Sequence, residues 1–272
     1  MKLSFMTWVC PDWSLSQILA AAIRYGYEAV EPRAEANQAH GVELETTKKV
    51  RKQIRKQFAD CGVEISAIAT SRRYALAAEH ELQESIELTK RYLELAADVG
   101  TPHLRVFGGG TPEGMDFSDA KQRVAESLHE CGPLAAEHGV YLCLETHDSY
   151  SLSADCVETV RMAGHPNVAI CWDVLHPYRQ GESIEEAFDN VRGFVRHCHV
   201  HDATRPADDG PGGWEMALMG TGDVPHDEAV RLLAGINFQG ALSGEWIQAF
   251  PPEQVLPHDA RVLDEYRRAA AG

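Results

Sequence analysis

The chain has 272 residues, of which 44% are hydrophobic and 24% charged, and its net charge is −16. This length and composition suit one α/β domain spanning residues 1–272. So negative a surface repels phosphodiester backbones, which argues against nucleic acid as a partner.

Membrane insertion and disulfide bonding are also disfavoured by the sequence. No apolar run approaches the ~18–20 residues that a membrane span needs, and MKLSFMTW at the N-terminus resembles a first strand rather than a signal peptide. The seven cysteines include no CxxC pair. We therefore expect reduced thiols and a cytoplasmic protein. Cys143 and Cys171 stand two residues before Glu145 and Asp173, acidic residues that end predicted strands. Residues two apart on a strand face the same side, so we expect both cysteines to point, like these acidic residues, into the interior of the fold.

Short β-rich runs alternate with longer amphipathic segments along the whole chain. The predicted strands are 3–7, 28–32, 63–69, 102–107, 140–147, 168–174, 195–202 and 240–246. The predicted helices include 15–23, 43–60 and 79–98, with a capping box at Ser14 and Gln17 and terminating glycines at 26, 62, 100 and 139.

Eight strands alternating with helices predict a single (β/α)8 TIM barrel. A doubly wound open sheet is the alternative, but the glycine-rich turn typical of that fold is absent after the first strand. The segment 203–223, rich in Gly, Pro and Asp, follows the seventh strand. We interpret it as a loop on the catalytic face, either a mobile lid or plain disorder.

Each of the last four predicted strands ends in a residue of metal-ligand type. These residues are Glu145, Asp173, His199 and Glu245. Parallel strands of a barrel end on one face, so the four side chains should converge. Three carboxylates with one imidazole predict one divalent metal ion, with Mn²⁺ first and Mg²⁺, Co²⁺ or Zn²⁺ as alternatives. Such an ion could stabilise an enediolate while Glu145 and Glu245 act as acid and base.

Several motifs resemble the xylose isomerase-like barrel family of sugar isomerases and epimerases, which includes hydroxypyruvate isomerase, ketose 3-epimerases and inosose dehydratase. The motifs are Glu145, WDVLH (172–176), HVHDA (199–203), SGEW (243–246), EAVEP (28–32) and RVFGG (105–109). The resemblance covers essentially the whole chain. It implies that Glu145, Asp173, His199 and Glu245 hold the metal and that the two glutamates move protons.

The resemblance also implies substrate-binding roles for His176 and Arg205, and it allows a homo-oligomer. His199 is preferred over His197 and His201 because it satisfies the family pattern His-x-x-Asp. His147 departs from the asparagine often found near there in epimerases.

Further substrate-binding candidates are His147, His201 and Arg105. Arg105 either holds a substrate oxygen or pairs with Glu145 or Glu31. Glu31 either contacts substrate or a group beside the metal, or it forms a structural salt bridge.

Four functions follow from these observations. The first is a metal-dependent isomerase or epimerase of a small sugar or polyol-derived carbonyl compound. The second is a lyase or dehydratase at the same site, favoured by the extra imidazoles of His147 and His201. An apurinic endonuclease is disfavoured because the ends of strands two to four carry no histidine. A binding protein with a vestigial site is disfavoured by the intact ligand set.

Overall fold

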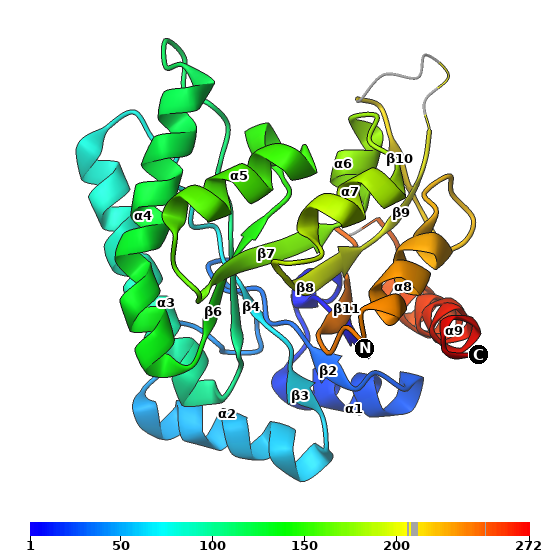
Figure 1. Cartoon of the computed structure of the whole chain (residues 1–272). Helices are drawn as coiled ribbons and strands as arrows, with labels where there is room; N and C mark the ends of the chain where they lie inside the picture. The colour runs from blue at the N-terminus through cyan, green and yellow to red at the C-terminus, as the bar shows by residue number, and fades with distance from the viewer. Residues whose placement is uncertain (206, 208–211, 248) are drawn as a thin grey trace.

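The computed structural model describes residues 1–205, 207, 212–247 and 249–272. Its centre is a parallel sheet of seven strands, in the order β1-β11-β8-β7-β6-β5-β4, with β2 and β3 forming a separate parallel pair (Figure 1). The strands of this central assembly are β1 (Lys2–Phe5), β2 (Ala29–Val30), β3 (Glu64–Ile65), β4 (Ile68–Ala69), β5 (His103–Val106), β6 (Tyr141–Glu145), β7 (Val168–Asp173), β8 (Val195–Val200) and β11 (Ala241–Gly244).

Single parallel bridges join the β2–β3 pair to the sheet on both sides. Met6 bridges to Glu31, and Arg33 bridges to Ala69. The ring of strands therefore closes, and the predicted TIM barrel is confirmed. The strand expected over 28–32 is shorter because Pro32 has no backbone N–H to donate. The strand expected over 63–69 divides into β3, which pairs with β2, and β4, which pairs with β5.

Helices surround the sheet and alternate with its strands along most of the chain (Figure 1). They are α1 (Leu15–Tyr25), α2 (Lys48–Cys61), α3 (Glu79–Val99), α4 (Phe117–His138), α5 (Ser153–Ala163), α6 (Leu175–Arg179), α7 (Ile184–Val191), α8 (His226–Gly235) and α9 (Pro252–Ala271), with short 3-10 turns at Thr7–Val9 and Asp148–Tyr150. The capping box of Ser14 and Gln17 is present. Glycines 26, 62, 100 and 139 end their helices with φ between 66° and 88°. Helix α2 begins later than predicted because Thr47 caps it.

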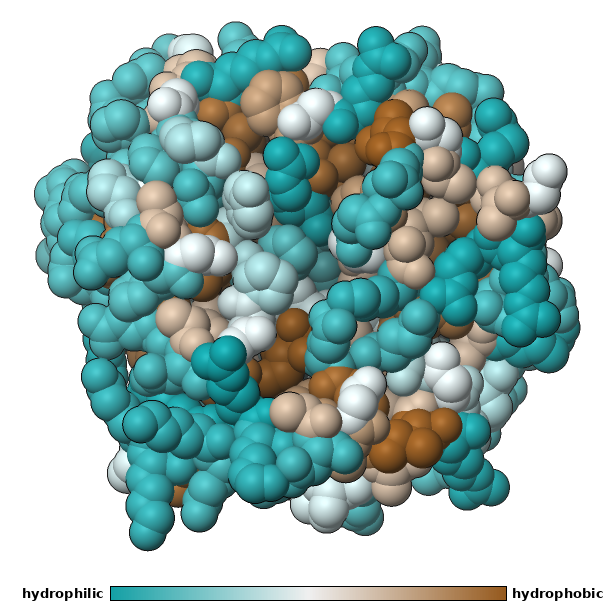
Figure 2. All heavy atoms as spheres, turned by 60° about the horizontal axis from the view of Figure 1, so that its bottom comes forward, coloured by the Kyte–Doolittle hydropathy of each residue, from teal (hydrophilic) through white to brown (hydrophobic). Residues whose placement is uncertain are grey.

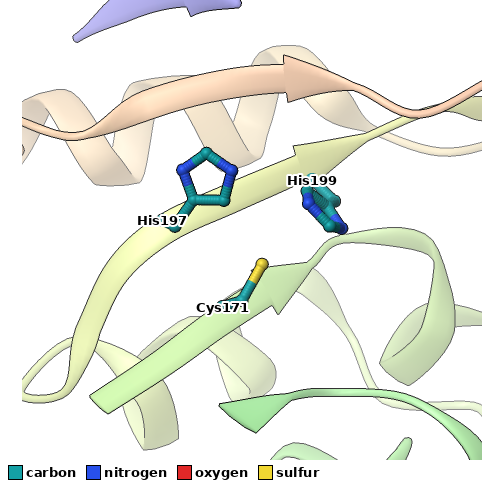
Figure 3. Close-up of side chains that lie close together, drawn as sticks. All are labelled: Cys171, His197 and His199. Atoms are coloured by element: carbon teal, nitrogen blue, oxygen red, sulfur yellow. The ribbon is translucent and has the colours of Figure 1, made fainter. Parts of the chain in front are cut away.

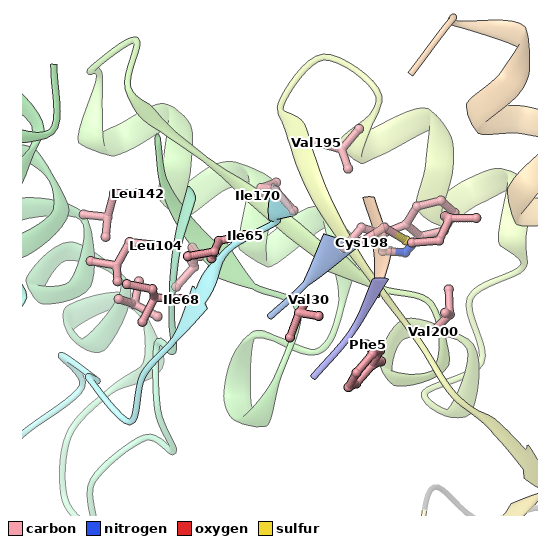
Figure 4. Packing of buried hydrophobic residues seen from close by; sticks show 14 of the residues in the cluster. Phe5, Val30, Ile65, Ile68, Leu104, Leu142, Ile170, Val195, Cys198 and Val200 are labelled. Atoms are coloured by element: carbon pink, nitrogen blue, oxygen red, sulfur yellow. The ribbon is translucent and has the colours of Figure 1, made fainter. Parts of the chain in front are cut away.

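Alternate side chains of the strands face opposite sides of the sheet, which separates two kinds of environment. Those facing the helices form the large hydrophobic core, part of which Figure 4 shows, including Phe5, Val30, Ile65, Ile68, Leu104, Leu142, Ile170, Val195, Cys198 and Val200. Cys143, Ala169 and Cys171 form a separate small cluster inside the barrel. The interior position predicted for both cysteines is therefore confirmed.

The outer surface is mostly hydrophilic on the face shown in Figure 2, where hydrophobic residues form only small separate groups. Large exposed hydrophobic side chains are scattered over several elements; they include Ile23, Val50, Leu152, Met162, Ile236 and Ile247. Such isolated residues are ordinary on a protein surface. Within the described ranges, no helix has both the length and the apolar character needed to cross a membrane.

The segment after β8 differs from the predicted loop. It contains β9 (Asp202–Thr204) and β10 (Glu215–Ala217), which pair antiparallel. The carboxylate of Asp202 accepts backbone N–H groups from Ala203 (2.8 Å), Gly220 (2.9 Å) and Gly222 (2.9 Å), so it organises the return of this hairpin. Residues 206 and 208–211 of the predicted lid lie outside the described residues, and a lid stays a prediction.

Candidate active site

Strand register brings the four ligand-type residues together. Asp173 on β7 is directly opposite His199 on β8, and His199 is opposite Ser243 on β11. Glu145 ends β6, and Glu245 follows the last residue of β11. All four side chains are buried, and their ligand atoms lie within 4.8 Å of one another. The structure therefore places the predicted set around one point at the carboxyl ends of the strands.

The imidazole of His199 lies between the two glutamates. Its Nδ1 is 3.1 Å from Glu145 Oε1 and 3.0 Å from Glu245 Oε2. Burial raises the pKa of Glu245, but the charges of His199 and Arg105 outweigh burial and bring this pKa down to about 2. Burial lowers the pKa of His199, and the surrounding acidic groups raise it well above its usual value. Both carboxylates are therefore directed at the same ring nitrogen of His199.

Arg105 reaches the same carboxylates from β5. Its side chain is 1% exposed, with Nε 3.1 Å from Glu145 Oε2 and Nη2 3.7 Å from Glu245 Oε1. Its Nη1 donates to the carbonyl of Thr70 at 2.7 Å, and its guanidinium lies 4.1 Å from the ring centre of Phe107. Of the two roles open to Arg105, pairing with Glu145 is the one that the structure describes.

Asp173 joins the ligand cluster to two further imidazoles. Its Oδ1 accepts the backbone N–H groups of Leu175 (2.9 Å) and His176 (3.1 Å) at the start of α6. Its Oδ2 lies 2.9 Å from Nε2 of His201 and 4.0 Å from Nε2 of His176. Burial raises the pKa of Asp173, but the imidazoles of His176 and His201 bring it well below its usual value. Burial lowers the pKa of His176 to about 3 because it disfavours the charged form. Burial also lowers the pKa of His201, but the carboxylate of Asp173 outweighs burial and raises it overall.

His147 stands at the mouth of the site. Its side chain is 30% exposed, its Nδ1 lies 3.0 Å from Asp148 Oδ1, and its ring centre lies 4.5 Å from that of His176. Asp148 has a φ of 49°, a conformation that non-glycine residues rarely adopt outside turns and functional sites. Asp148 was not predicted as a site residue, and its neighbour His147 was the only signal for it.

Arg205 lies further out than the other predicted residues. Its backbone N–H donates to Asp223 at 2.7 Å, and its guanidinium donates to the hydroxyl of Tyr178 at 3.1 Å. It also lies 5.5 Å from the ring centres of Tyr178 and Trp214. The structure therefore places Arg205 beside α6 and β10, at the rim.

Glu31, which follows β2, faces β8 inside the barrel. Its Oε2 lies 2.8 Å from Nε2 of His197, and its two oxygens lie 3.1 Å and 3.2 Å from Nε2 of His199. Burial raises the pKa of Glu31, but the two imidazoles lower it well below its usual value. The sequence signal for Glu31 was its place at a strand end, the same signal that identified the ligand set.

The donor set fits a divalent cation. Carboxylate oxygens at about 2.2 Å from one ion lie at most about 4.4 Å apart, which agrees with the compact cluster. Three carboxylates and one imidazole are donors that Mn²⁺, Mg²⁺ and Co²⁺ accept. Among the described residues, Arg105 is the only arginine or lysine paired with these three carboxylates, so the cluster keeps negative charge that a divalent cation can balance. Two overlapping groups, Cys171–His197–His199 (Figure 3) and Asp173–His176–His201, also have ligand geometry.

Comparisons with known proteins agree with the barrel fold. A family model described as "Xylose isomerase-like TIM barrel" matches residues 19–266. A 3-dehydroshikimate dehydratase of Bacillus anthracis is 28% identical over 191 residues, which are 68% of this chain and 65% of the dehydratase, slightly under two thirds of its length. A fructoselysine 3-epimerase of Escherichia coli O157:H7 is 23% identical over 70% of this chain and 68% of the epimerase.

Among solved structures, the IolI protein with a bound zinc atom has a similar fold. Its TM-score is 0.82 at 18% identity, and the match covers 99% of this chain and 98% of that one. At this identity the likeness shows the fold alone. Together with the family model, which spans most of the sequence, it leads to one conclusion: the chain belongs to the xylose isomerase-like TIM barrel family.

Proposed function

We propose that the protein is a divalent-metal-dependent isomerase or epimerase of a small sugar or other polyhydroxy carbonyl compound. One observation carries this proposal: Glu145 and Glu245, from different strands, both approach Nδ1 of His199 at 3.0–3.1 Å. Two carboxylates facing one point can remove a proton and return it elsewhere.

The proposed ligands are Glu145, Asp173, His199 and Glu245, and Mn²⁺ is the first choice for the ion. When bound, a divalent cation polarises the oxygens of a hydroxycarbonyl compound and so acidifies the adjacent C–H bond. Glu145 ends β6 and Glu245 directly follows β11, so the barrel strands position the two glutamates relative to each other.

Each glutamate has a different neighbourhood. The guanidinium of Arg105 lies 3.1 Å from the carboxylate of Glu145 but 3.7 Å from that of Glu245, so it stabilises the ionised form of Glu145 more strongly. We therefore assign the first proton removal to Glu245, whose carboxylate is less restrained, and the return of a proton to Glu145. We also infer that His176 and His201 contact substrate oxygens, since both lie beside Asp173 of the proposed ligand set.

Dehydration is a second candidate, and a specific observation favours it. Nδ1 of His147 is held near Asp148, which leaves Nε2 to deliver a proton at the mouth of the site. In β-elimination a glutamate takes the proton next to the carbonyl, the C=C bond forms, and the leaving hydroxyl departs as water with a proton from His147. The 28% identical relative is a 3-dehydroshikimate dehydratase, which agrees with this alternative.

Proton NMR in D2O tests both candidates on Mn²⁺-loaded protein with ketoses, hydroxypyruvate, inososes and 3-dehydroshikimate. Deuterium entering the carbon next to the carbonyl, with interconversion of two sugars, supports the isomerase or epimerase. A vinylic signal that disappears in His147→Gln, while deuterium exchange persists, supports the dehydratase. If the metal-loaded protein exchanges no deuterium into any of these compounds, the proposed chemistry is refuted for this substrate class.

A further inference from the structure

A buried hydrogen-bonded group lies directly behind His199, on the side away from Glu145 and Glu245. It consists of Glu31 and His197, whose side chains, like that of His199, are 0% exposed. Glu31 is drawn into the barrel by its backbone, because its N–H donates to the carbonyl of Phe5 at 2.8 Å and it forms the bridge with Met6.

The hydrogen bonds of this group determine which nitrogen of His199 carries a proton. An ionised carboxylate only accepts hydrogen bonds, so the imidazole Nε2 atoms that lie 2.8–3.2 Å from Glu31 must both be donors. For a neutral His199, a proton on Nε2 leaves the lone pair on Nδ1. That is the nitrogen facing the two glutamates.

We propose that Glu31 is a positioning residue for the site: it holds His199 as the Nε2–H tautomer with Nδ1 directed at the cation, while His197 anchors the carboxylate. This inference rests on the proposed metal site but not on the reaction that the site catalyses. It extends the ligand set to a supporting carboxylate from the opposite half of the barrel, an arrangement that orients metal-binding histidines and raises their basicity.

The surroundings offer His199 no equivalent acceptor. The thiol of Cys171 on β7 points toward the two imidazoles (Figure 3), but a thiol is a weak hydrogen-bond acceptor. Nε2 of His197 is already directed at Glu31. Among the described residues, Glu31 is therefore the only one whose carboxylate pairs with His199 through Nε2.

Glu31→Gln is the informative change, because it keeps the shape but not the hydrogen-bonding pattern. An amide oxygen can accept from one imidazole, while the amide NH2 then faces the N–H of the other. Ser66→Ala is the matched control. Ser66 Oγ is 2.7 Å from Ser4 Oγ, a buried hydrogen bond inside the same barrel that does not involve His199.

Two readouts separate positioning from general stability. Calorimetric Mn²⁺ titration should show affinity about 10–100-fold weaker in Glu31→Gln and unchanged in Ser66→Ala. ¹⁵N NMR of the histidine rings in metal-free protein at neutral pH should show the Nε2 atoms of both His197 and His199 protonated in the wild type, and the signal of at least one of these N–H groups changed in Glu31→Gln. Glu31→Asp, which keeps the charge at a shorter reach, should recover part of the affinity.

Wild-type Mn²⁺ affinity in folded Glu31→Gln, or equal losses in both variants, would overturn the proposal. So would unchanged ring spectra of His197 and His199. If the wild type binds no Mn²⁺, the proposed metal site fails, whereas the ring spectra still decide whether Glu31 holds the Nε2–H of His199. The two failures are therefore distinguishable.

Discussion

Replacing Arg105 by Met tests how the charges of the site are balanced. Met preserves much of the apolar stem and the packing near Phe107, 4.1 Å from the guanidinium, but removes the positive charge. Glu145 then loses its partner at 3.1 Å, and Glu245 loses a cation at 3.7 Å. The carbonyl of Thr70 also loses its donor at 2.7 Å.

The expected cost follows from burial. Removing one partner of a buried ion pair costs about 3–5 kcal/mol, because the remaining charge is left uncompensated. We therefore expect metal-free Arg105→Met to lose about 3–5 kcal/mol of unfolding free energy. A bound divalent cation would take over part of the missing charge, so the variant should bind Mn²⁺ more tightly. Mn²⁺ at 100 times its Kd adds about 2.7 kcal/mol to whichever protein it binds.

Urea unfolding without metal measures the free energy that the Arg105–Glu145 pair contributes. The proteins compared are the wild type, Arg105→Met, Glu145→Gln and the double variant. If the pair is coupled, the double variant should be more stable than the sum of the single losses predicts, by about 0.5–3 kcal/mol. Additive losses would refute the charge-balance argument. A loss below about 1 kcal/mol in Arg105→Met, together with a raised KM, would instead support the substrate-binding role expected from the sequence.

Three more changes have definite expected outcomes. Glu245→Gln should lower deuterium exchange into substrate by at least about a hundredfold while near-ultraviolet circular dichroism stays unchanged; full activity would exclude proton transfer by this residue. His40, whose Nδ1 accepts the N–H of Val42 at 2.9 Å, has a pKa lowered by burial to about 4. Its unfolded form binds a proton first, so stability should fall as pH drops from about 6.5 to 4, by about 3 kcal/mol more in wild type than in His40→Gln; parallel urea-derived pH profiles would contradict this. Gly222→Ala should cost about 1–3 kcal/mol in urea unfolding, because its Cβ would lie 2.3 Å from Asp202 Oδ1; unchanged stability would show that the hairpin yields freely.

The sequence was most informative where one rule decides both structure and position. A buried β-rich run predicts a strand, and in a barrel its last residue must lie on the same face as the ends of the others. That rule alone brought Glu145, Asp173, His199 and Glu245 to one place, and their ligand atoms lie within 4.8 Å. The helix ends could also be predicted from single residues, since only glycine adopts the left-handed conformation without strain.

Features that depend on a distant partner were not predictable in the same way. The hairpin of β9 and β10 forms because Asp202 collects N–H groups from residues 18–20 positions away, which no local pattern reveals. The sequence left Glu31 and Arg105 with two roles each, since choosing between them requires the distance across the barrel. Arg205 follows His199 closely in sequence, yet the hairpin carries it to Tyr178 and the rim.

The contacts of Glu31 and Arg105 show that the two halves of the barrel contribute different groups to the site. The later strands, β6, β7, β8 and the end of β11, supply the ligand-type residues. The earlier strands supply the groups behind them, Glu31 after β2 at Nε2 of His199 and Arg105 of β5 beside Glu145. A ligand set needs support from outside itself, because three carboxylates repel one another and an imidazole can present either nitrogen. Changes in the first half should therefore alter metal affinity and charge balance while every ligand remains in place.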